Sequence, residues 1–285
     1  MKLKFGMSPI SWSNDDLPEL GGETSLETCL RETRLAGFTG TETGGKFPKD
    51  KANLGRVLKE HHLQLVSGWF SGQLLNISAE QEIINIRPQL ELFRDLGAAV
   101  IVYGETWNTV QNVRNAPLCD KPILPEADFT AYGERLTKVA EYCASEGVPL
   151  AFHHHMGTGV ETERELDLVG HLVFAGGDLM GVVDRYGHRI NHVHTKDIRQ
   201  EVMATVDRTK DSFLDCVLRG VFTVPGDGMI DYGRFMQALA DKNYEGWVIV
   251  EAEQDPAKAN PFEYAVMGYN ALQQAALAAG YSIID

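Results

Sequence analysis

Short apolar segments alternate with longer segments of helical periodicity along most of this chain. The apolar segments begin near residues 2, 39, 63, 98, 149, 190 and 247. Between them, segments such as 25–36 and 79–96 carry apolar residues at helical spacing. This order predicts repeated βα units and a parallel sheet. Because the 285 residues show no linker or break in composition, we predict one domain, residues 1–285, with a (β/α)8 TIM barrel fold.

The alternation fails once, after the apolar segment near residue 149. Residues 161–169 and 178–186 both have helical patterns, and the short stretch between them is too brief for a strand with two connections. A closed barrel needs eight strands, whereas seven are found. We therefore predict that the polypeptide is discontinuous or severely irregular between about Glu165 and His171. The absent piece, with the sixth strand, would be roughly 15–20 residues long.

Composition excludes several kinds of partner. The net charge of −14 is unfavourable for tracking a phosphate backbone or an anionic membrane. We find no signal peptide and no apolar run that could cross a bilayer. The four cysteines lie far apart without a Cys-x-x-Cys pair, which is typical of reduced thiols. The sequence therefore predicts a cytoplasmic protein that binds neither nucleic acid nor membrane.

Three consecutive histidines end the apolar segment that begins near residue 149. Strand side chains alternate, so His153 and His155 are expected on one side and His154 on the other. Two imidazoles at the end of a strand can bind a metal or a polar substrate. Taken alone, the run is equally explained by hydrogen-bonded core histidines or an exposed loop.

Two later strands add polar groups at the same end of the predicted barrel, where active sites of this fold are built. Residues 189–197 place His192 beside His194 and Lys196 on one side, and residues 245–253 place Glu251 and Glu253 together. For each pair alone, a buried hydrogen-bonded pair or a solvated strand end stays an alternative. Taken together, His153, His194 and Glu251 predict a shared metal site. Nitrogen and carboxylate ligands suit Mn²⁺, Co²⁺, Fe²⁺ or Zn²⁺ better than Ca²⁺.

Other polar and aromatic residues near the strand ends are predicted to bind the substrate. They are Trp12, Lys46, Trp69, His192, Arg199 and Glu253. Tryptophans could wall a sugar-sized pocket, although they are also common in cores. Arg199 is equally explained as ordinary surface charge.

Stretches distributed through nearly the whole chain resemble the inosose dehydratases of the xylose isomerase-like TIM barrel superfamily. They are residues 8–10 with 14–16, 46–48, 152–158, 191–199, 222–228 and 250–256. The resemblance implies removal of water from a keto-inositol, 2-keto-myo-inositol, in inositol catabolism. It also implies a divalent metal, cobalt or manganese, and glutathione as a requirement of the family. The expected partner is a small cyclic polyol ketone, and a homo-oligomer is left open.

The resemblance also bears on the metal ligands. The superfamily uses Glu, Asp, His and Glu from four strand ends; here His194 matches the His and Glu251 the last Glu. The first Glu falls on His153, which is a departure. The Asp normally stands three residues before a His, but the residue three before His171 is Leu168. The missing ligand thus coincides with the missing strand.

Water loss from a keto-inositol is a β-elimination, in which a base removes the α-proton and an acid protonates the leaving hydroxyl. A metal would polarise the ketone. We predict His155 or Lys196 as the base and Glu105 or His171 as the acid.

Two other functions stay open. A sugar isomerase or epimerase of the same superfamily would begin with the same proton removal. A non-catalytic polyol-binding protein would result if the metal site is broken. A nucleic-acid repair enzyme of this fold is disfavoured by the acidic charge.

Overall fold

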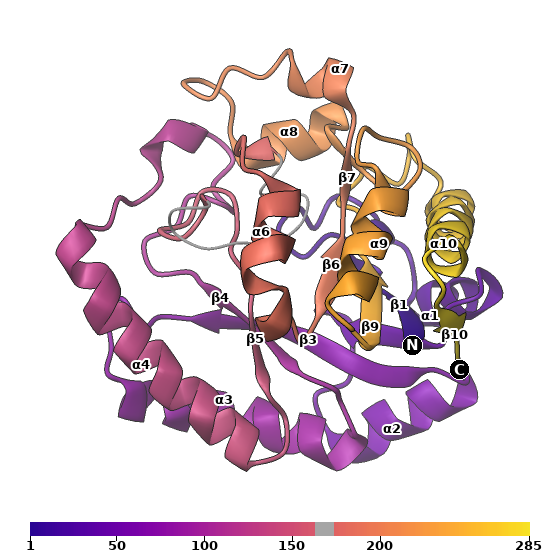
Figure 1. Ribbon diagram of the computed structural model, residues 1–285, viewed down its shortest axis with the longest axis horizontal. Helices are drawn as coiled ribbons and strands as arrows, with labels where there is room; N and C mark the ends of the chain where they lie inside the picture. The colour runs from indigo at the N-terminus through magenta and orange to yellow at the C-terminus, as the bar shows by residue number, and fades with distance from the viewer. Residues whose placement is uncertain (163–173) are drawn as a thin grey trace.

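A parallel sheet with helices around it organises the chain in the computed structural model, which describes residues 1–162 and 174–285 (Figure 1). The strands are β1 (Lys2–Met7), β2 (Gly40–Thr43), β3 (Gln64–Gly72), β4 (Ile101–Glu105), β5 (Leu150–Phe152), β6 (Val193–Thr195), β9 (Gly246–Val250) and β10 (Ser282–Ile283). Their order is β5-β4-β3-β2-β1-β9-β6, with β10 beside β1. The seven predicted strands are therefore confirmed, and β10 is an addition that the sequence pattern did not show.

Helices connect the strands and pack around the sheet (Figure 1). They are α1 (Leu26–Leu35), α2 (Lys51–Glu60), α3 (Ala79–Leu96), α4 (Glu126–Ser145), α6 (Leu179–Tyr186), α9 (Tyr232–Asp241) and α10 (Pro261–Ala278). Shorter elements lie between β6 and α9: β7 (Asp197–Ile198), α7 (Gln200–Met203), α8 (Phe213–Arg219) and β8 (Phe222–Thr223). The part of the chain that the structure describes also contains three 3-10 turns: Pro9–Ser11, Leu118–Asp120 and Gly187–Arg189. In the described residues, each helix is too short or too polar to cross a bilayer.

Local sequence signals set the helix boundaries. The side chains of Ser25, Asp50 and Ser78 accept hydrogen bonds from backbone amides in the first turns of α1, α2 and α3. Gly97 ends α3 in the left-handed conformation, at φ 76°. These caps explain why the predicted segments 25–36 and 79–96 lie within a residue of the observed α1 and α3.

The inner face of the sheet is packed tightly. Val66, Trp247 and Ile249 form one inner cluster, while larger apolar clusters lie between sheet and helices. A Cβ atom on Gly40 would lie 2.4 Å from Val66 Cγ2 and 2.6 Å from the Trp247 ring. The glycine in β2 is therefore what lets the indole of Trp247 fill the inside of the barrel.

Among the described residues, the sheet is open where the sequence pattern failed. β5 and β6 are the two ends of the strand order, and no backbone pairing joins them in the described part of the chain. The stretch from Glu165 to His171, where a break was predicted, lies outside the described residues. The catalytic role predicted for His171 therefore stays a prediction.

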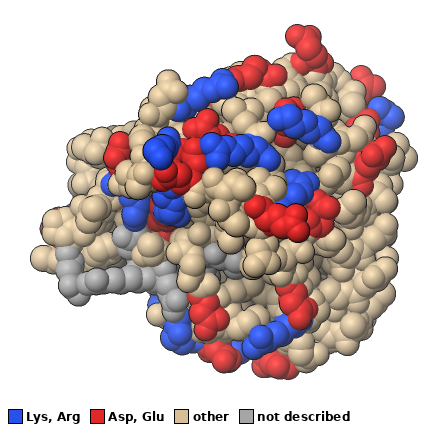
Figure 2. All heavy atoms as spheres, turned by 90° about the horizontal axis from the view of Figure 1, so that it is seen from above, with Lys and Arg blue, Asp and Glu red and all other residues tan. Residues whose placement is uncertain are grey.

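Charged side chains of both signs are mixed on the surface. On the face shown in Figure 2, Lys and Arg lie among Asp and Glu and form no continuous basic stripe.

Candidate functional site

A cavity of about 490 Å³ lies at the carboxyl ends of the strands. Its walls come from the loops after β1, β2 and β4, from Trp69 and Ser71 in β3, and from residues at the ends of β5, β6 and β9. His153 and His155 line it, as the predicted alternation requires, whereas His154 is buried elsewhere and its pKa is lowered to about 3 by burial. The cavity is large enough for a six-membered polyol ring.

His194 is the centre of the site. Its Nδ1 lies 2.6 Å from Glu251 Oε2, and its Nε2 lies 2.9 Å from Glu42 Oε1. Burial lowers the pKa of His194, but the charges and hydrogen bonds of Glu42 and Glu251 outweigh burial and raise this pKa to about 10. Without a metal, the imidazole is therefore a cation held between two carboxylates.

Glu42 was missed as a site residue, although it was visible as a polar residue at the end of an apolar strand. Ser67 Oγ donates to its Oε1 at 2.6 Å, and His192 Nε2 lies 3.7 Å from the same oxygen. Burial raises the pKa of Glu42, but His194 and His192 outweigh burial and hold this pKa well below its usual range. A register shift between Thr41 and Glu42 interrupts the β2–β3 ladder at this point.

The three residues predicted to share a metal do converge. Ligand atoms of His153, His194 and Glu251 lie within 4.8 Å of one another, and all three residues are buried and line the cavity. Burial holds the pKa of His153 well below its usual value, so this imidazole is neutral and able to coordinate. Two imidazoles and one carboxylate facing an open cavity fit a catalytic divalent metal.

A second group of potential ligands shares His194. It consists of Glu42, His192 and His194, again with ligand atoms within 4.8 Å of one another. Only Glu42 and His194 of this group line the 490 Å³ cavity, because His192 lines a different cavity. We therefore favour the first group as the metal site.

Lys196 is buried between two carboxylates. Its Nζ lies 2.9 Å from Glu251 Oε1 and 2.6 Å from Glu253 Oε1. Burial lowers the pKa of Lys196, but both carboxylates outweigh burial and raise it. A lysine held in its protonated form is a poor base, so of the two predicted bases the geometry favours His155.

His155 has the orientation that a base in this cavity needs. Its Nδ1 donates to the carbonyl oxygen of Met156 at 2.9 Å, which in the neutral ring leaves the basic lone pair on Nε2. That Nε2 lies 3.9 Å from Glu253 Oε1, and the ring is edge-on to Phe213 with centroids 4.7 Å apart. The imidazole is thus positioned on both sides while still lining the cavity.

Glu105, predicted as an acid, is not among the residues that line the cavity. It shares a face of β4 with Tyr103, whose ring packs in the apolar cluster between the sheet and α3 and α4. Glu105 Oε1 accepts from the amide of Trp107, and burial raises the pKa of this carboxyl to about 7. We therefore assign it no catalytic role.

Besides His192, three predicted substrate-binding residues lie away from the cavity. Trp12 is buried and donates through its indole N–H to Glu32. Lys46 Nζ binds the carbonyl oxygens of residues 21, 22 and 24. Arg199 forms an ion pair with Asp227 at 2.7 Å beside the β7–β8 ribbon. Trp69 and Glu253 do line the cavity.

In addition to Glu42, the cavity residues Asp16 and Gln111 were missed. Asp16 belongs to the loop after β1, and its pKa is raised by burial and by the charge of Glu253. Gln111 belongs to the loop after β4 and is buried. A signal for Asp16 was present, because residues 14–16 are one of the stretches that carry the family resemblance.

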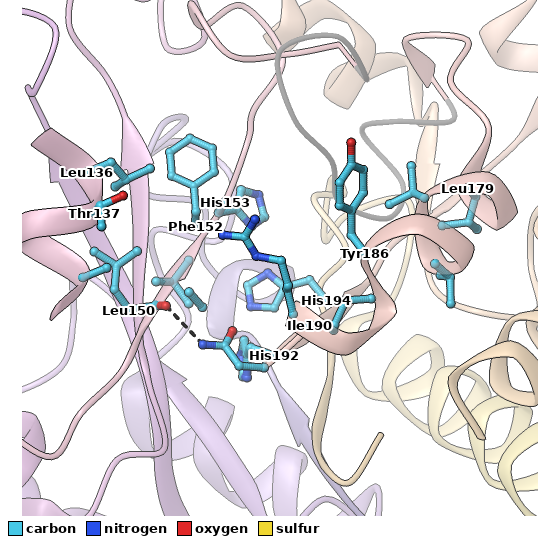
Figure 3. Close-up of a pocket in the computed structure, with 17 residues that line it drawn as sticks. Leu136, Thr137, Leu150, Phe152, His153, Leu179, Tyr186, Ile190, His192 and His194 are labelled. Carbon is cyan, nitrogen blue, oxygen red and sulfur yellow. Dashed lines mark hydrogen bonds between the residues drawn. The ribbon is translucent and has the colours of Figure 1, made fainter. Parts of the chain in front are cut away.

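A second cavity, of about 300 Å³, lies at the open side of the sheet (Figure 3). Side chains of α4, β5 and α6 line it, and His153, His192 and His194 lie at its inner end. Asn191 Nδ2 donates to the carbonyl oxygen of Leu150 at 3.1 Å across this opening. Within the described residues, the two ends of the sheet are therefore joined here by a side chain rather than by a backbone ladder.

Comparisons with known proteins agree with this architecture. The sequence model of the xylose isomerase-like TIM barrel family matches residues 30–268. The chain is 45% identical over 297 residues to the rhizopine catabolism protein MocC of Rhizobium meliloti, covering 99% of this chain and 91% of that protein. It is 43% identical over 281 residues to the inosose dehydratase of Geobacillus thermodenitrificans (strain NG80-2), covering 93% and 94%.

Solved structures of low identity share the fold. An L-ribulose 3-epimerase superposes with a TM-score of 0.65 at 15% identity, covering 98% of this chain and 96% of that one. A structure of the IolI protein with a binding zinc atom superposes with a TM-score of 0.66 at 17% identity, covering 96% and 98%.

The comparison with MocC also bears on chain length. The matched region spans 297 positions and this chain has 285 residues, so at least 12 positions (297 − 285) of that region have no counterpart here.

Proposed function

The chain belongs to the inosose dehydratase family of xylose isomerase-like TIM barrels, and we propose that it removes water from 2-keto-myo-inositol in inositol catabolism. It is a carbon–oxygen lyase of the hydro-lyase class. The observation that carries the proposal is that one polyol-sized cavity holds both a nitrogen–carboxylate ligand group and an oriented histidine base.

His153, His194 and Glu251 would hold the divalent metal. When bound, such an ion polarises a ketone oxygen and stabilises the negative charge that develops there. We propose cobalt or manganese as the ion and glutathione as a further requirement, both on the family resemblance. Nitrogen and carboxylate ligands are compatible with either metal.

The elimination requires one base and one acid on the same ring. We propose that His155 Nε2 takes the proton from the carbon next to the ketone, and that Glu253 stabilises the imidazolium that forms. Asp16 gives its proton to the departing hydroxyl, because its raised pKa keeps it protonated to higher pH than an ordinary aspartate. The C–H electron pair becomes the new carbon–carbon double bond as the C–O bond breaks, and water leaves. The resulting enol is a tautomer of a 1,2-diketone.

The experiment is turnover of keto-inositol by the metal-loaded protein, followed through the absorbance of the conjugated product and by NMR. The expected result is dehydration that stops when the metal is removed and returns when it is restored. Epimerisation of a ketose without dehydration would instead assign the chain to the isomerase and epimerase branch. Metal-dependent binding without turnover of either substrate would indicate a polyol-binding protein.

We also propose that residues 1–285 form one domain, and that the protein is cytoplasmic and binds neither nucleic acid nor membrane. Pairing of the C-terminal β10 with the N-terminal β1 supports the first proposal. The four free cysteines support the second, and the mixed surface charge and net charge of −14 support the third. A homo-oligomer is compatible with the proposal and is measurable by light scattering.

A further inference from the structure

The cavity at the strand ends contains a buried acceptor atom that no described residue satisfies. Gln111 is 6% exposed and lines the cavity, and its Oε1 has no hydrogen-bond donor within the described part of the chain. A buried acceptor without a donor is destabilising. Such an atom on a cavity wall therefore indicates a ligand that supplies the donor.

Hydrogen bonds of Thr109 and of the backbone hold Gln111 at this position. Thr109 Oγ1 accepts from the amide of Gln111 at 3.1 Å and donates to the carbonyl oxygen of Gly157 at 2.9 Å. That carbonyl also accepts from the amide of Val110 at 2.9 Å. A Cβ on Gly157 would lie 3.0 Å from the amide nitrogen of Gln111, and the φ of Gly157 is +78°. The loop that carries Gln111 is thus latched onto the turn that directly follows His155.

The other polar groups of the cavity define the chemistry of the missing donor. No Lys or Arg is among the described residues that line the cavity. Three acidic residues, Asp15, Asp16 and Glu253, do line it. The Oε2 atom of Glu253 is also buried and has no hydrogen-bond partner among the described residues. Acceptors and carboxylates repel a phosphate or carboxylate group, while a neutral hydroxyl can donate to them.

We propose that Gln111 is a specificity-determining residue whose amide oxygen accepts a hydrogen bond from one ring hydroxyl of the substrate. With Glu253 it selects a neutral cyclic polyol ketone over a phosphorylated or carboxylated one. This inference rests on the proposed function. It adds to that function which group of the substrate is recognised, a ring hydroxyl, and by which residue.

The test compares wild type with Gln111→Leu, which removes the acceptor at similar volume. Binding of myo-inositol, a cyclic polyol without the reactive ketone, and of its single-deoxy analogues is measured by calorimetry on the metal-loaded protein, alongside turnover of keto-inositol. In wild type, one deoxy analogue should bind about tenfold more weakly than myo-inositol. Gln111→Leu should bind myo-inositol about tenfold more weakly than wild type does. To this variant, the same deoxy analogue should bind as tightly as myo-inositol.

Gln81→Leu is the matched control, because it makes the same chemical change at an exposed position of α3. It should leave binding unchanged. The melting temperature of Gln111→Leu should equal or exceed that of wild type, since the substitution removes an unsatisfied buried oxygen. A lower melting temperature with unchanged polyol affinity would show a structural role and overturn the proposal.

The readouts separate this inference from the proposed function. If keto-inositol turns over and Gln111→Leu binds every analogue as wild type does, the inference fails and the function stands. If keto-inositol does not turn over but polyol binding depends on Gln111 and on one hydroxyl, the function fails and the inference stands. Binding of an inositol phosphate as tightly as myo-inositol would overturn the selection for a neutral ligand.

Discussion

The imidazole Nδ1 of His194 lies 2.6 Å from Oε2 of Glu251, and both residues are buried. The same two residues are proposed metal ligands, so in the metal-free protein they bind each other through a proton. A metal must displace that proton to bind. The site therefore exists in two forms, a proton-bridged form and a metal-bound form, and pH sets the balance between them.

Metal affinity should rise with pH. The pKa of His194 is raised to about 10, so below this pH a proton occupies the ring and is released when metal binds. Affinity should increase by up to about tenfold per pH unit through the neutral range, because one proton is exchanged per ion. Calorimetric titration of Mn²⁺ in buffers of different ionisation enthalpy measures the proton released. Affinity that is independent of pH would contradict a ligand role for His194.

His194→Ala should destabilise the metal-free protein as well as prevent metal binding. It leaves the buried carboxylate of Glu42 without its charged imidazole partner and leaves Glu251 paired with Lys196 alone, and breaking a buried pair in this way typically costs about 3–5 kcal/mol. The stabilisation from the raised pKa of His194 is complete below 6.5 and is lost as pH rises through about 10. The stabilisation from the lowered pKa of Glu42 is present above pH 4.5 and is lost as the pH falls below this value. The difference in the free energy of unfolding between wild type and His194→Ala should be largest from about pH 4.5 to 6.5 and shrink towards pH 10. Urea unfolding measures it.

Asp16→Asn should lower kcat far more than it raises KM. The amide keeps the shape of the side chain but cannot protonate the leaving hydroxyl. A loss of about 10²–10⁴ in kcat is expected for removal of a general acid. Asp15→Asn is the control, because its carboxylate accepts from the amide of Gly45 at 2.8 Å. Equal loss in both variants would indicate an electrostatic effect of the loop rather than proton transfer by Asp16.

Glu105→Gln should retain activity and change the pH dependence of stability. Burial raises the pKa of Glu105 from 4.5 to about 7, so the folded state favours the protonated form. Its contribution is present below 4.5 and is lost as pH rises through about 7. Above pH 7 the variant should be more stable than wild type by on the order of 3 kcal/mol. A catalytic acid at this position would instead reveal itself as a large loss of kcat with no gain in stability.

Asn191→Ala should loosen the open side of the sheet. The substitution removes the hydrogen bond to the carbonyl oxygen of Leu150, which joins the two ends of the strand order. Because Asn191 is exposed, the expected loss is only about 0.5–1.5 kcal/mol. Hydrogen exchange should quicken at the amide of His153, which bonds to Tyr103 at the β4–β5 edge, and remain unchanged at the amide of Phe5 in β1. Uniform change at both amides would mean that the opening is not local.

The alternation of apolar and helical segments by itself determined the βα order, the seven strands and the starts of α1 and α3 near residues 25 and 79. Those features depend on periodicity, which acts over a few residues. The period of a strand also predicted that His194 and Lys196 share one face, and both side chains do contact Glu251. Membership of the family followed from stretches of residues in order along the chain.

The tertiary structure decided the pairing of charges and the destination of each side chain. Glu42 and His194 are far apart in sequence and meet only because β2 and β6 close around the same cavity. Glu105 has the same sequence signature as Glu42, a carboxylate at the end of an apolar strand, yet is not among the residues lining that cavity. A one-residue change of register sends a side chain to the other face of a sheet, and β2 contains such a shift at Thr41 and Glu42. The polar ends of the strands can therefore be recognised in the sequence, but which of them face one another is set by register and by the packing of distant strands.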